Sequence, residues 1–161
     1  MDRYFLVLTI IDIFVLSFMC ILTKLSESLN TKQKRGFFLV FLLTALISIL
    51  EVITLAVDGM PKEYRFLNII SNYLGFGLSP ALAIGLAYAQ NKKTTMNKEM
   101  KIAIYLELIY LIFLAISIPY GLVFSVNKNN VYARGPLFFI YVLAYFIAIV
   151  YLLLSTILIS R

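Results

Sequence analysis

The stretch that decides the fold is Phe66–Ala89, FLNIISNYLGFGLSPALAIGLAYA, a long apolar segment without a charged residue. A helix that crosses a lipid bilayer needs about 20 mostly apolar residues, which this segment supplies. Small residues recur at every fourth position over Ser71–Ser79 and again over Ala81–Ala89, a pattern that lets helices approach closely. Pro80 leaves the Phe76 carbonyl without its usual helical partner, which favours a kink or a local opening. The segment is therefore predicted to be a spanning helix at the centre of a bundle.

Four other stretches are also long and apolar enough to span a membrane. They are Tyr4–Thr23, Gly36–Val57, Ile102–Val126 and Pro136–Ile159. The segments between the spans are short, polar and rich in Asn, Gly, Pro or Lys, as membrane-edge turns are. The first span is longer than a signal-peptide core and lacks an A-x-A-like cleavage site, so we expect the protein to retain it. The predicted fold class is all-α, a polytopic membrane protein with one domain of five transmembrane helices over residues 1–161.

The composition indicates an integral membrane protein. Of the 161 residues, 62% are hydrophobic and 14% are charged, and the mean hydropathy is +0.95. An ordinary soluble domain is about 45–50% apolar and about 25% charged, so the first partner expected is the lipid bilayer. The chain has no His and a single Cys, Cys20, which excludes a His-based catalytic centre, a Cys/His zinc site and an intramolecular disulfide. We expect no enzyme activity, no metal and no cofactor within these residues.

Basic residues are distributed unevenly between the two ends of the predicted bundle. One end carries Lys24, Lys32, Lys34, Arg35, Lys92, Lys93, Lys98, Lys101 and Arg161, and the other carries Arg3, Lys62, Arg65, Lys128 and Arg134. Short cytoplasmic loops hold the excess of Lys and Arg, so we expect the N-terminus outside and the C-terminus inside, in the cytoplasmic (inner) membrane. The net charge of +6 comes from clusters between apolar runs, which indicates membrane orientation and no nucleic-acid partner.

Three acidic residues fall inside the predicted spans: Asp12, Glu51 and Glu107. An ionisable group there costs at least about 2.5–3.5 kcal/mol, so it normally faces the bundle interior or a wet cavity. At about 1.5 Å per residue, Asp12 and Glu51 lie roughly 12 Å and 9 Å below the outer edge and can share a layer. Glu107 lies within about 8 Å of the inner edge and is expected to reach that interface by snorkelling.

Polar residues near Glu51 predict a pocket that opens outward. One helical face of the second span carries Thr44, Ser48, Glu51 and Thr54, and a similar stripe on the third span includes Asn68 and Asn72. Arg134 is expected to reach inward toward Glu51 or Asp12. The functional hypothesis is a ligand-binding pocket formed by Asp12, Glu51, Asn68, Asn72, Tyr120, Tyr132 and Arg134. In the alternative interpretation, these groups pair with one another and only set the register of the helices.

Two segments resemble a known family. They are SNYLGFGLSPALAIGLAYA at Ser71–Ala89 and NNVYARGPLFFIYVLAYFIAIVYLLLS at Asn129–Ser155, and their most specific parts are Leu74–Pro80 and Asn129–Phe139. Both are similar to the five-span membrane sensory module that precedes diguanylate cyclase (GGDEF) domains in many Gram-positive bacteria, with related modules before sensor histidine kinases. The resemblance implies an N-out input domain whose last helix runs into a cytoplasmic output domain. Because no GGDEF or kinase motif precedes Arg161, we expect an isolated sensory module, a truncated product or a relative that works through a partner.

The leading functional hypothesis is a membrane-embedded signal-input module. A small ligand, a lipid or a state of the envelope would bias the packing of the helices, and the last helix would pass the change to a cytoplasmic output domain or a signalling partner. The resemblance also implies a homodimer, because cyclase and kinase outputs generally act as dimers. The alternative is a small transporter or channel component that uses the intramembrane acids, although an odd number of spans does not suit an inverted repeat. A membrane scaffold for another protein is a third hypothesis.

Overall fold

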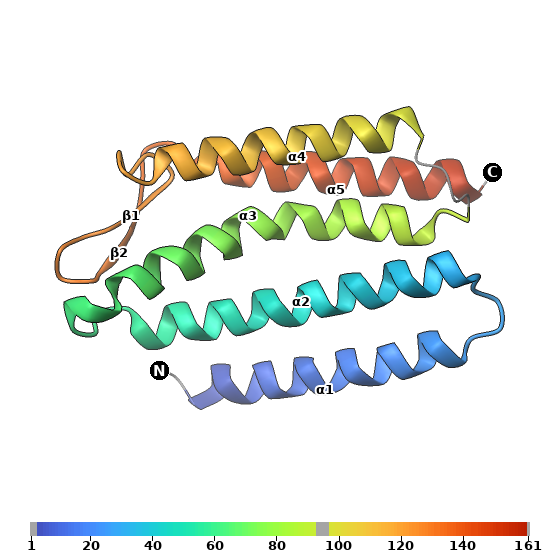
Figure 1. The fold of residues 1–161 in the computed structure, drawn as a ribbon, viewed down its shortest axis with the longest axis horizontal. Coiled ribbons are helices and arrows are strands. Elements are labelled where there is room, and N and C mark those ends of the chain that lie inside the picture. Colours follow the sequence, from blue (N-terminus) through green and yellow to red (C-terminus); the bar gives the residue numbers. More distant parts are fainter. Residues whose placement is uncertain (1–2, 93–96, 161) are drawn as a thin grey trace.

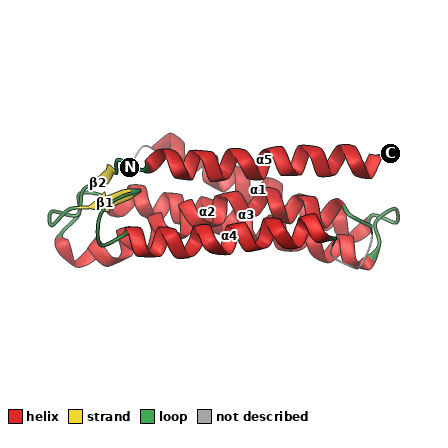
Figure 2. Ribbon diagram, turned by 90° about the horizontal axis from the view of Figure 1, so that it is seen from above, coloured by secondary structure: helices red, strands yellow, loops and turns green. Residues whose placement is uncertain are grey.

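The computed structural model describes residues 3–92 and 97–160. Within these residues there are five long helices, one short 3-10 helix and a two-stranded antiparallel sheet (Figures 1 and 2). In chain order the elements are α1 (Arg3–Leu25), α2 (Thr31–Val57), η1 (Lys62–Tyr64), α3 (Arg65–Gln90), α4 (Lys98–Ser117), β1 (Phe124–Val126), β2 (Tyr132–Arg134) and α5 (Phe138–Ser160). All five α-helices are long and apolar enough to cross a membrane, which confirms the predicted five-helix pattern. Two basic residues of the charge count, Lys93 and Arg161, lie outside the described residues.

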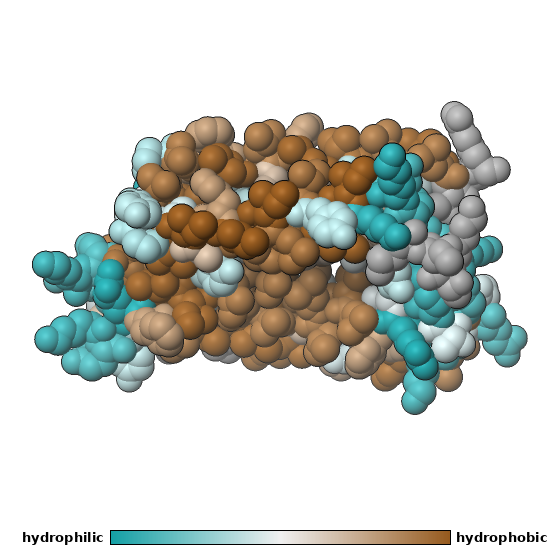
Figure 3. All heavy atoms as spheres, turned by 45° about the horizontal axis from the view of Figure 1, so that its top comes forward, coloured by the Kyte–Doolittle hydropathy of each residue, from teal (hydrophilic) through white to brown (hydrophobic). Residues whose placement is uncertain are grey.

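Hydrophobic side chains form a band around the middle of the molecule. They cover the centre of the face seen in Figure 3, and hydrophilic side chains gather at both ends. Large apolar side chains on the outer helices are widely exposed, such as Phe14 on α1 (74%) and Leu158 on α5 (70%). Monomeric soluble proteins rarely expose apolar surface on this scale, so this band is suited to contact with lipid.

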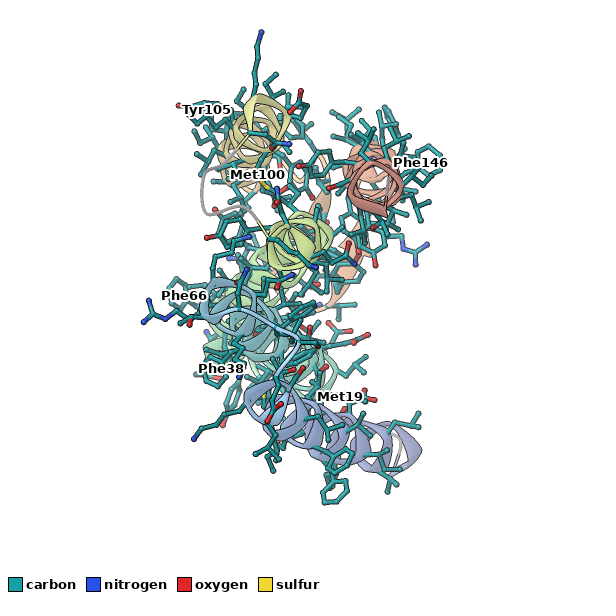
Figure 4. All side chains as sticks on the ribbon, turned by 90° about the vertical axis from the view of Figure 1, so that its right-hand side faces the viewer. Met19, Phe38, Phe66, Met100, Tyr105 and Phe146 are labelled. Atoms are coloured by element: carbon teal, nitrogen blue, oxygen red, sulfur yellow. The ribbon has the colours of Figure 1, made fainter. Side chains whose placement is uncertain are left out.

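Helix α3 lies at the centre of the bundle, as predicted. It packs against α2 on one side and against α4 and α5 on the other, while α1 packs mainly against α2. The end-on view in Figure 4 shows this order, with α1 farthest from α4 and α5. The two ends of the chain lie at opposite ends of the bundle (Figure 1). Which of these ends faces the cytoplasm stays a prediction.

Small residues bring α2 and α3 together near the C-terminal end of α3. A Cβ atom added to Gly36 would lie 2.9 Å from the Cα atom of Ala89, and one added to Gly85 would lie 3.1 Å from Cγ2 of Val40. Both distances are tight, so larger side chains would push the helices apart. The small-residue pattern over Ala81–Ala89 therefore serves helix packing, as predicted.

Helix α2 begins before the predicted start at Gly36, because Asn30 caps it. The Asn30 Oδ1 atom accepts a hydrogen bond from the Gln33 amide at 2.9 Å, and the Gln33 Oε1 atom accepts one from the Asn30 amide at 3.2 Å. This capping box satisfies amides that otherwise lack partners at a helix start. In the same first turn, the Lys32 ammonium group donates to the carbonyl oxygens of Tyr88 and Asn91. The start of α2 thus also satisfies carbonyl groups at the end of α3.

The predicted fourth span, Ile102–Val126, is wrong at both ends. Helix α4 begins at Lys98, where the Asn97 side chain accepts a hydrogen bond from the Met100 amide at 3.0 Å, and it ends at Ser117. The boundaries of α1, α3 and α5 fit better, because they differ from the predicted ranges by at most two residues at each end. The long apolar run of the fourth span therefore contains both a helix and a different element after it.

That second element is a β-hairpin, which departs from the all-α prediction. The strands pair in the register Phe124↔Arg134 and Val126↔Tyr132. The helix stops before them because Pro119 has no N–H and Gly121 adopts a positive φ of 61°. Phe124 is only 1% exposed, so its apolar side chain is buried in the hairpin's contact with the helices and does not extend a span.

Candidate functional site

A polar cleft opens at the hairpin end of the bundle. It lies between α2, α3, β2 and the start of α5, and its volume is about 440 Å³. Small-molecule sites typically measure about 300–1,000 Å³. Of the seven residues predicted for the pocket, four line this cleft: Glu51, Asn72, Tyr132 and Arg134. These four residues come from the second and third predicted spans and from the loop before the fifth span. Residues of the fifth span, Phe138 and Tyr141, also line the cleft.

Charged groups of both signs line the cleft. Glu51 near the end of α2 and Asp58 directly after it contribute carboxylates, and Arg134 of β2 contributes a guanidinium group. In place of the expected ion pair with Glu51 or Asp12, the Arg134 guanidinium carbon lies over the Phe138 ring, 4.8 Å from its centroid. This is a cation–π contact. It places the positive charge on one wall of the cleft.

Tyr132 lies beside Arg134 on the hairpin and offers a hydroxyl group to the cleft. Burial raises the pKa of this hydroxyl, and the neighbouring Arg134 guanidinium acts in the opposite direction. Because an ordinary tyrosine pKa is about 10, a raised value keeps the hydroxyl neutral at physiological pH. Tyr132 is therefore available as a hydrogen-bond donor to a ligand.

Small residues of α3 form the floor of the cleft. Ser71, Gly75 and Ser79 all line it, and a Cβ atom added to Gly75 would have no neighbour within 4 Å. The Ser71–Ser79 pattern was expected to let two helices approach closely, but at Gly75 it borders open space instead. Its small side chains leave a space that the helices do not fill.

Aromatic rings form the wall between α3, the hairpin and α5. Phe76 is at the centre of this group, with ring centroids 6.2 Å from Tyr132, 5.7 Å from Phe138 and 4.8 Å from Tyr141. Edge-to-face and offset contacts at these distances are favourable for aromatic pairs. The wall couples the position of Arg134, through Phe138, to the packing of α5 against α3.

An asparagine network, which comprises Asp58, Asn68, Asn72 and Asn130, joins α3 to the loops at this end. Asn68 is fully buried, and its amide nitrogen donates to Oδ1 of Asp58 at 3.1 Å and to Oδ1 of Asn130 at 3.0 Å. The Asn72 amide donates to Oδ1 of Asn68 at 2.8 Å. Asp58 also accepts a hydrogen bond from the Tyr132 backbone amide at 2.7 Å. For Asn68, the structure agrees with the alternative interpretation, in which polar groups bind one another and fix the architecture.

Asn130 ties the hairpin loop to the end of α2. Its side-chain amide donates to the carbonyl oxygens of Val57 at 2.6 Å and Met60 at 3.1 Å. Its backbone has a positive φ of 58°, a conformation that Asn tolerates better than most residues. Because Asn130 is fully buried, these hydrogen bonds are shielded from water and hold the hairpin over the cleft.

Arg65 holds the other side of the hairpin. Its guanidinium group donates from Nε and Nη2 to the Val126 carbonyl oxygen at 3.1 Å and 2.9 Å, and from Nε to the Asn127 carbonyl oxygen at 3.0 Å. One end of the hairpin loop is therefore attached to Arg65 at the start of α3. The other end is attached, through the Asn130 side chain, to the end of α2. This arrangement sets the distance between β2 and the α2 wall of the cleft.

Two predicted site residues lie elsewhere. Asp12 is exposed on α1 and does not line the cleft, because α1 packs mainly against α2 at the edge of the bundle. Tyr120 is 74% exposed and lines a separate depression with Arg65 and Pro119. The predicted fourth span included Tyr120, whereas the helix ends at Ser117, before this residue.

Several residues that shape the site were not among the predicted ones, including Asp58, Phe138 and Asn130. Asp58 and Asn130 lie in segments that the sequence identifies as turns, and nothing in their spacing shows that they meet. Asn130 carried a weak local signal, because Asn is common where a turn needs a positive φ. Phe138 resembles its many apolar neighbours, so only its position beneath Arg134 marks it.

Glu107 does not behave as expected. Because α4 begins at Lys98 and ends at Ser117, Glu107 lies about halfway along the helix instead of near the inner edge. Its Oε1 atom is buried and has no hydrogen-bond partner among the described residues. The expectation that Glu107 reaches the interface by snorkelling is therefore wrong.

The described residues contain no group of three or more His, Cys, Asp or Glu side chains that could hold a metal ion. No protein-family model, no curated protein and no solved structure matches the chain. A functional assignment for this chain consequently rests on its own residues and their geometry.

Proposed function

We propose that this protein is a membrane-embedded sensory module that binds a small zwitterionic ligand, such as an amino acid, in the polar cleft. The observation that carries the proposal is the presence of carboxylates and a guanidinium group in one cleft of about 440 Å³ beside an aromatic wall. In this proposal the hairpin end faces outward and the opposite end faces the cytoplasm, as the charge distribution of the sequence favours.

The ligand chemistry follows from the position of each charge. Arg134 would bind a carboxylate group, for which a guanidinium is the best-suited side chain. Glu51 on the opposite wall would bind an ammonium group, and the rings of Phe76 and Tyr141 would contact an apolar side chain. A ligand with a single charge would leave one of these charged groups without a partner, so a zwitterion fits the cleft best.

Helix α5 is proposed to carry the signal. The hairpin that holds Arg134 leads directly into α5, whose C-terminal end lies at the opposite end of the bundle (Figure 1). A ligand that binds one arrangement of β2 and α5 more tightly than another shifts the population between them. The resemblance of Ser71–Ala89 and Asn129–Ser155 to sensory modules supports this proposal, because both segments contribute to the cleft. A cytoplasmic output domain or partner protein, and a homodimer, belong to the same proposal.

Transport is the alternative function, and the geometry supports it less well. The intramembrane acids would have to line one path, yet the residues around Glu51 and those around Glu107 belong to two cavities with no lining residue in common. Asp12 lines neither of them. Substrate-dependent flux into proteoliposomes that is lost in Glu51→Gln would support transport over sensing.

Ligand binding tests the proposal directly. The whole chain in lipid nanodiscs is titrated with the common amino acids, and binding is followed by calorimetry and by thermal stabilisation. We expect a subset of amino acids to bind, and Arg134→Gln and Glu51→Gln each to weaken binding by about tenfold or more, as for loss of a charge-assisted hydrogen bond. Lys128→Gln is the matched control, because Lys128 is an exposed cation on the same hairpin.

Two outcomes would contradict the proposal. One is that no amino acid binds the wild-type chain. The other is that Lys128→Gln weakens binding as much as Arg134→Gln, since a general charge effect would then explain the loss. Decarboxylated and N-acetylated forms of the best ligand separate the two charges, and each is expected to bind more weakly than the parent compound.

A further inference from the structure

A second cavity, the α4–α5 groove, lies between helices α4 and α5 over α3. The two helices stand side by side above α3 in the end-on view of Figure 4. The groove measures about 590 Å³ and is lined mostly by apolar side chains, including Leu106, Ile140 and Leu143. Two carboxylates, those of Glu99 and Glu107, also line it, and none of its described lining residues is Lys or Arg. The groove is therefore apolar, with two carboxyl groups among its lining residues.

Glu107 is the unusual group in this groove. Its Oε1 atom is buried and has no hydrogen-bond partner among the described residues, and it sits near the middle of α4. A polar atom that loses water and gains no partner destabilises the folded state. Inside a membrane, such a carboxyl group indicates a functional site.

The two hydroxyl groups that line the groove form hydrogen bonds elsewhere. The Tyr110 hydroxyl donates to the Phe76 carbonyl oxygen at 3.3 Å, and the Tyr151 hydroxyl donates to Sδ of Met100 at 3.6 Å. The groove itself therefore offers Glu107 no side-chain donor. A donor for its Oε1 atom has to come from a molecule that enters the groove.

We propose that the α4–α5 groove binds an amphipathic amine, a compact apolar molecule whose ammonium group donates a hydrogen bond to Glu107. The carboxyl groups of Glu99 and Glu107 favour a cation, and the apolar walls favour a hydrophobic body. Residues at the rim, such as Leu106 (54% exposed) and Leu143 (51%), are open on the outer surface of the bundle. The ligand therefore enters sideways, from the lipid. This site is separate from the polar cleft and goes beyond the sensory function proposed for it.

A matched set of three ligands tests the proposal. 1-Adamantylammonium, 1-adamantanol and 1-adamantanecarboxylate share one apolar cage and differ only in the polar group. Each is titrated into the whole chain in lipid nanodiscs, with empty nanodiscs to correct for partitioning into lipid. We expect the ammonium compound to bind at least about tenfold more tightly than the alcohol, because a charge-assisted hydrogen bond is stronger than a neutral one, and the carboxylate to bind least.

Variants of the chain test whether the three ligands bind in the α4–α5 groove. Glu107→Gln is expected to abolish the preference for the ammonium compound over the alcohol, whereas Glu99→Gln, nearer the start of α4, changes it by less than about threefold, as expected for a charge at an exposed rim. Leu143→Trp should weaken all three ligands by filling the groove. Arg134→Gln, in the polar cleft, should leave the binding of the ammonium compound and of the alcohol unchanged.

The proposal is overturned if the wild-type chain binds the ammonium compound and the alcohol equally. It is also overturned if Glu107→Gln keeps the preference, or if Arg134→Gln removes the binding. Thermal unfolding of Glu107→Gln shows whether the variant folds, and we expect it to be at least as stable as the wild type. Should it fail to fold, Leu143→Trp and the three ligands on the wild-type chain decide the question.

Discussion

The Tyr110 hydroxyl group on α4 lies 3.3 Å from the carbonyl oxygen of Phe76 on α3. Pro80 lacks the N–H that would normally donate to this carbonyl, so a tyrosine of the neighbouring helix supplies the missing hydrogen bond. Helix α3 continues through Pro80 and bends near its middle (Figure 1). The carbonyl that Pro80 leaves without its helical partner, as the sequence predicts, is thus satisfied by a contact between α3 and α4.

Removal of this hydroxyl group should destabilise the bundle. In Tyr110→Phe the ring stays and the Phe76 carbonyl is left without a donor, which should lower the free energy of unfolding by about 1 kcal/mol. Tyr105→Phe is the control, because Tyr105 is on the same helix and 65% exposed. Thermal unfolding of both variants in the same detergent measures the difference. Equal melting temperatures would show that the hydrogen bond contributes nothing.

Asn130 should be the most sensitive residue of the hairpin loop. In Asn130→Ala the hydrogen bonds to Val57 and Met60 are lost, and Ala, which tolerates a positive φ less well than Asn, must adopt the same backbone conformation. We therefore expect a loss of about 2 kcal/mol or more in the free energy of unfolding. Asn129→Ala, at the exposed neighbouring position, should cost less than about 0.5 kcal/mol.

Hydrogen exchange distinguishes the local effect of Asn130→Ala from a global one. We expect faster exchange over the hairpin and the loop after α2, and weaker ligand binding in the polar cleft. Unchanged exchange in the hairpin would contradict the role assigned to Asn130.

Two glycine substitutions should have opposite effects. Gly36→Ala places a Cβ atom 2.9 Å from the Cα atom of Ala89, so α2 and α3 must move apart, at a cost of about 1–3 kcal/mol. Gly75→Ala fills open space, and the better helix propensity of Ala stabilises α3 by up to about 1 kcal/mol. Thermal unfolding of the two variants and of the wild type measures their relative stabilities. A Gly36→Ala variant as stable as the wild type would show that the contact between Gly36 and Ala89 leaves room for a Cβ atom.

Cysteine labelling tests the proposed orientation. In a Cys20→Ser background, single cysteines replace Asn129 in the hairpin loop and Ser28 between α1 and α2, which lie at opposite ends of the bundle. A membrane-impermeant maleimide should label Asn129→Cys in intact cells and Ser28→Cys only after the cells are permeabilised. The reverse pattern would place the hairpin and the polar cleft on the cytoplasmic side.

The number of helices could be predicted from the sequence because of a simple physical constraint. A backbone in lipid must satisfy its own hydrogen bonds, so an apolar segment of about 20 residues forms a helix whatever its neighbours are. The same reasoning failed after Ser117, where the residues up to Val126 form a turn and then the first strand of a hairpin. Hydropathy does not distinguish burial in lipid from burial in protein, and only Pro119 and Gly121 marked the change.

The candidate site was predictable only in part, for a different reason. Helical periodicity identified Glu51 and Asn72 as polar groups on inward faces, and both line the cleft. Asp12 was included for its depth in the span, but it is exposed at the bundle edge, because the sequence does not show which helices are neighbours. Helical periodicity also gave no sign that Ser71–Ser79 borders a cavity and Ala81–Ala89 a helix contact.

The sequence by itself therefore determined that the chain forms five apolar helices joined by polar turns, since helix formation there depends on local hydropathy and backbone hydrogen bonding. The tertiary structure decided which polar groups meet. Asn130 reaches Asn68 across a long stretch of chain, Arg134 lies over Phe138, and Glu107 is left without a donor between α4 and α5. Such contacts depend on the order and rotation of the helices, which the packing of side chains across their interfaces sets.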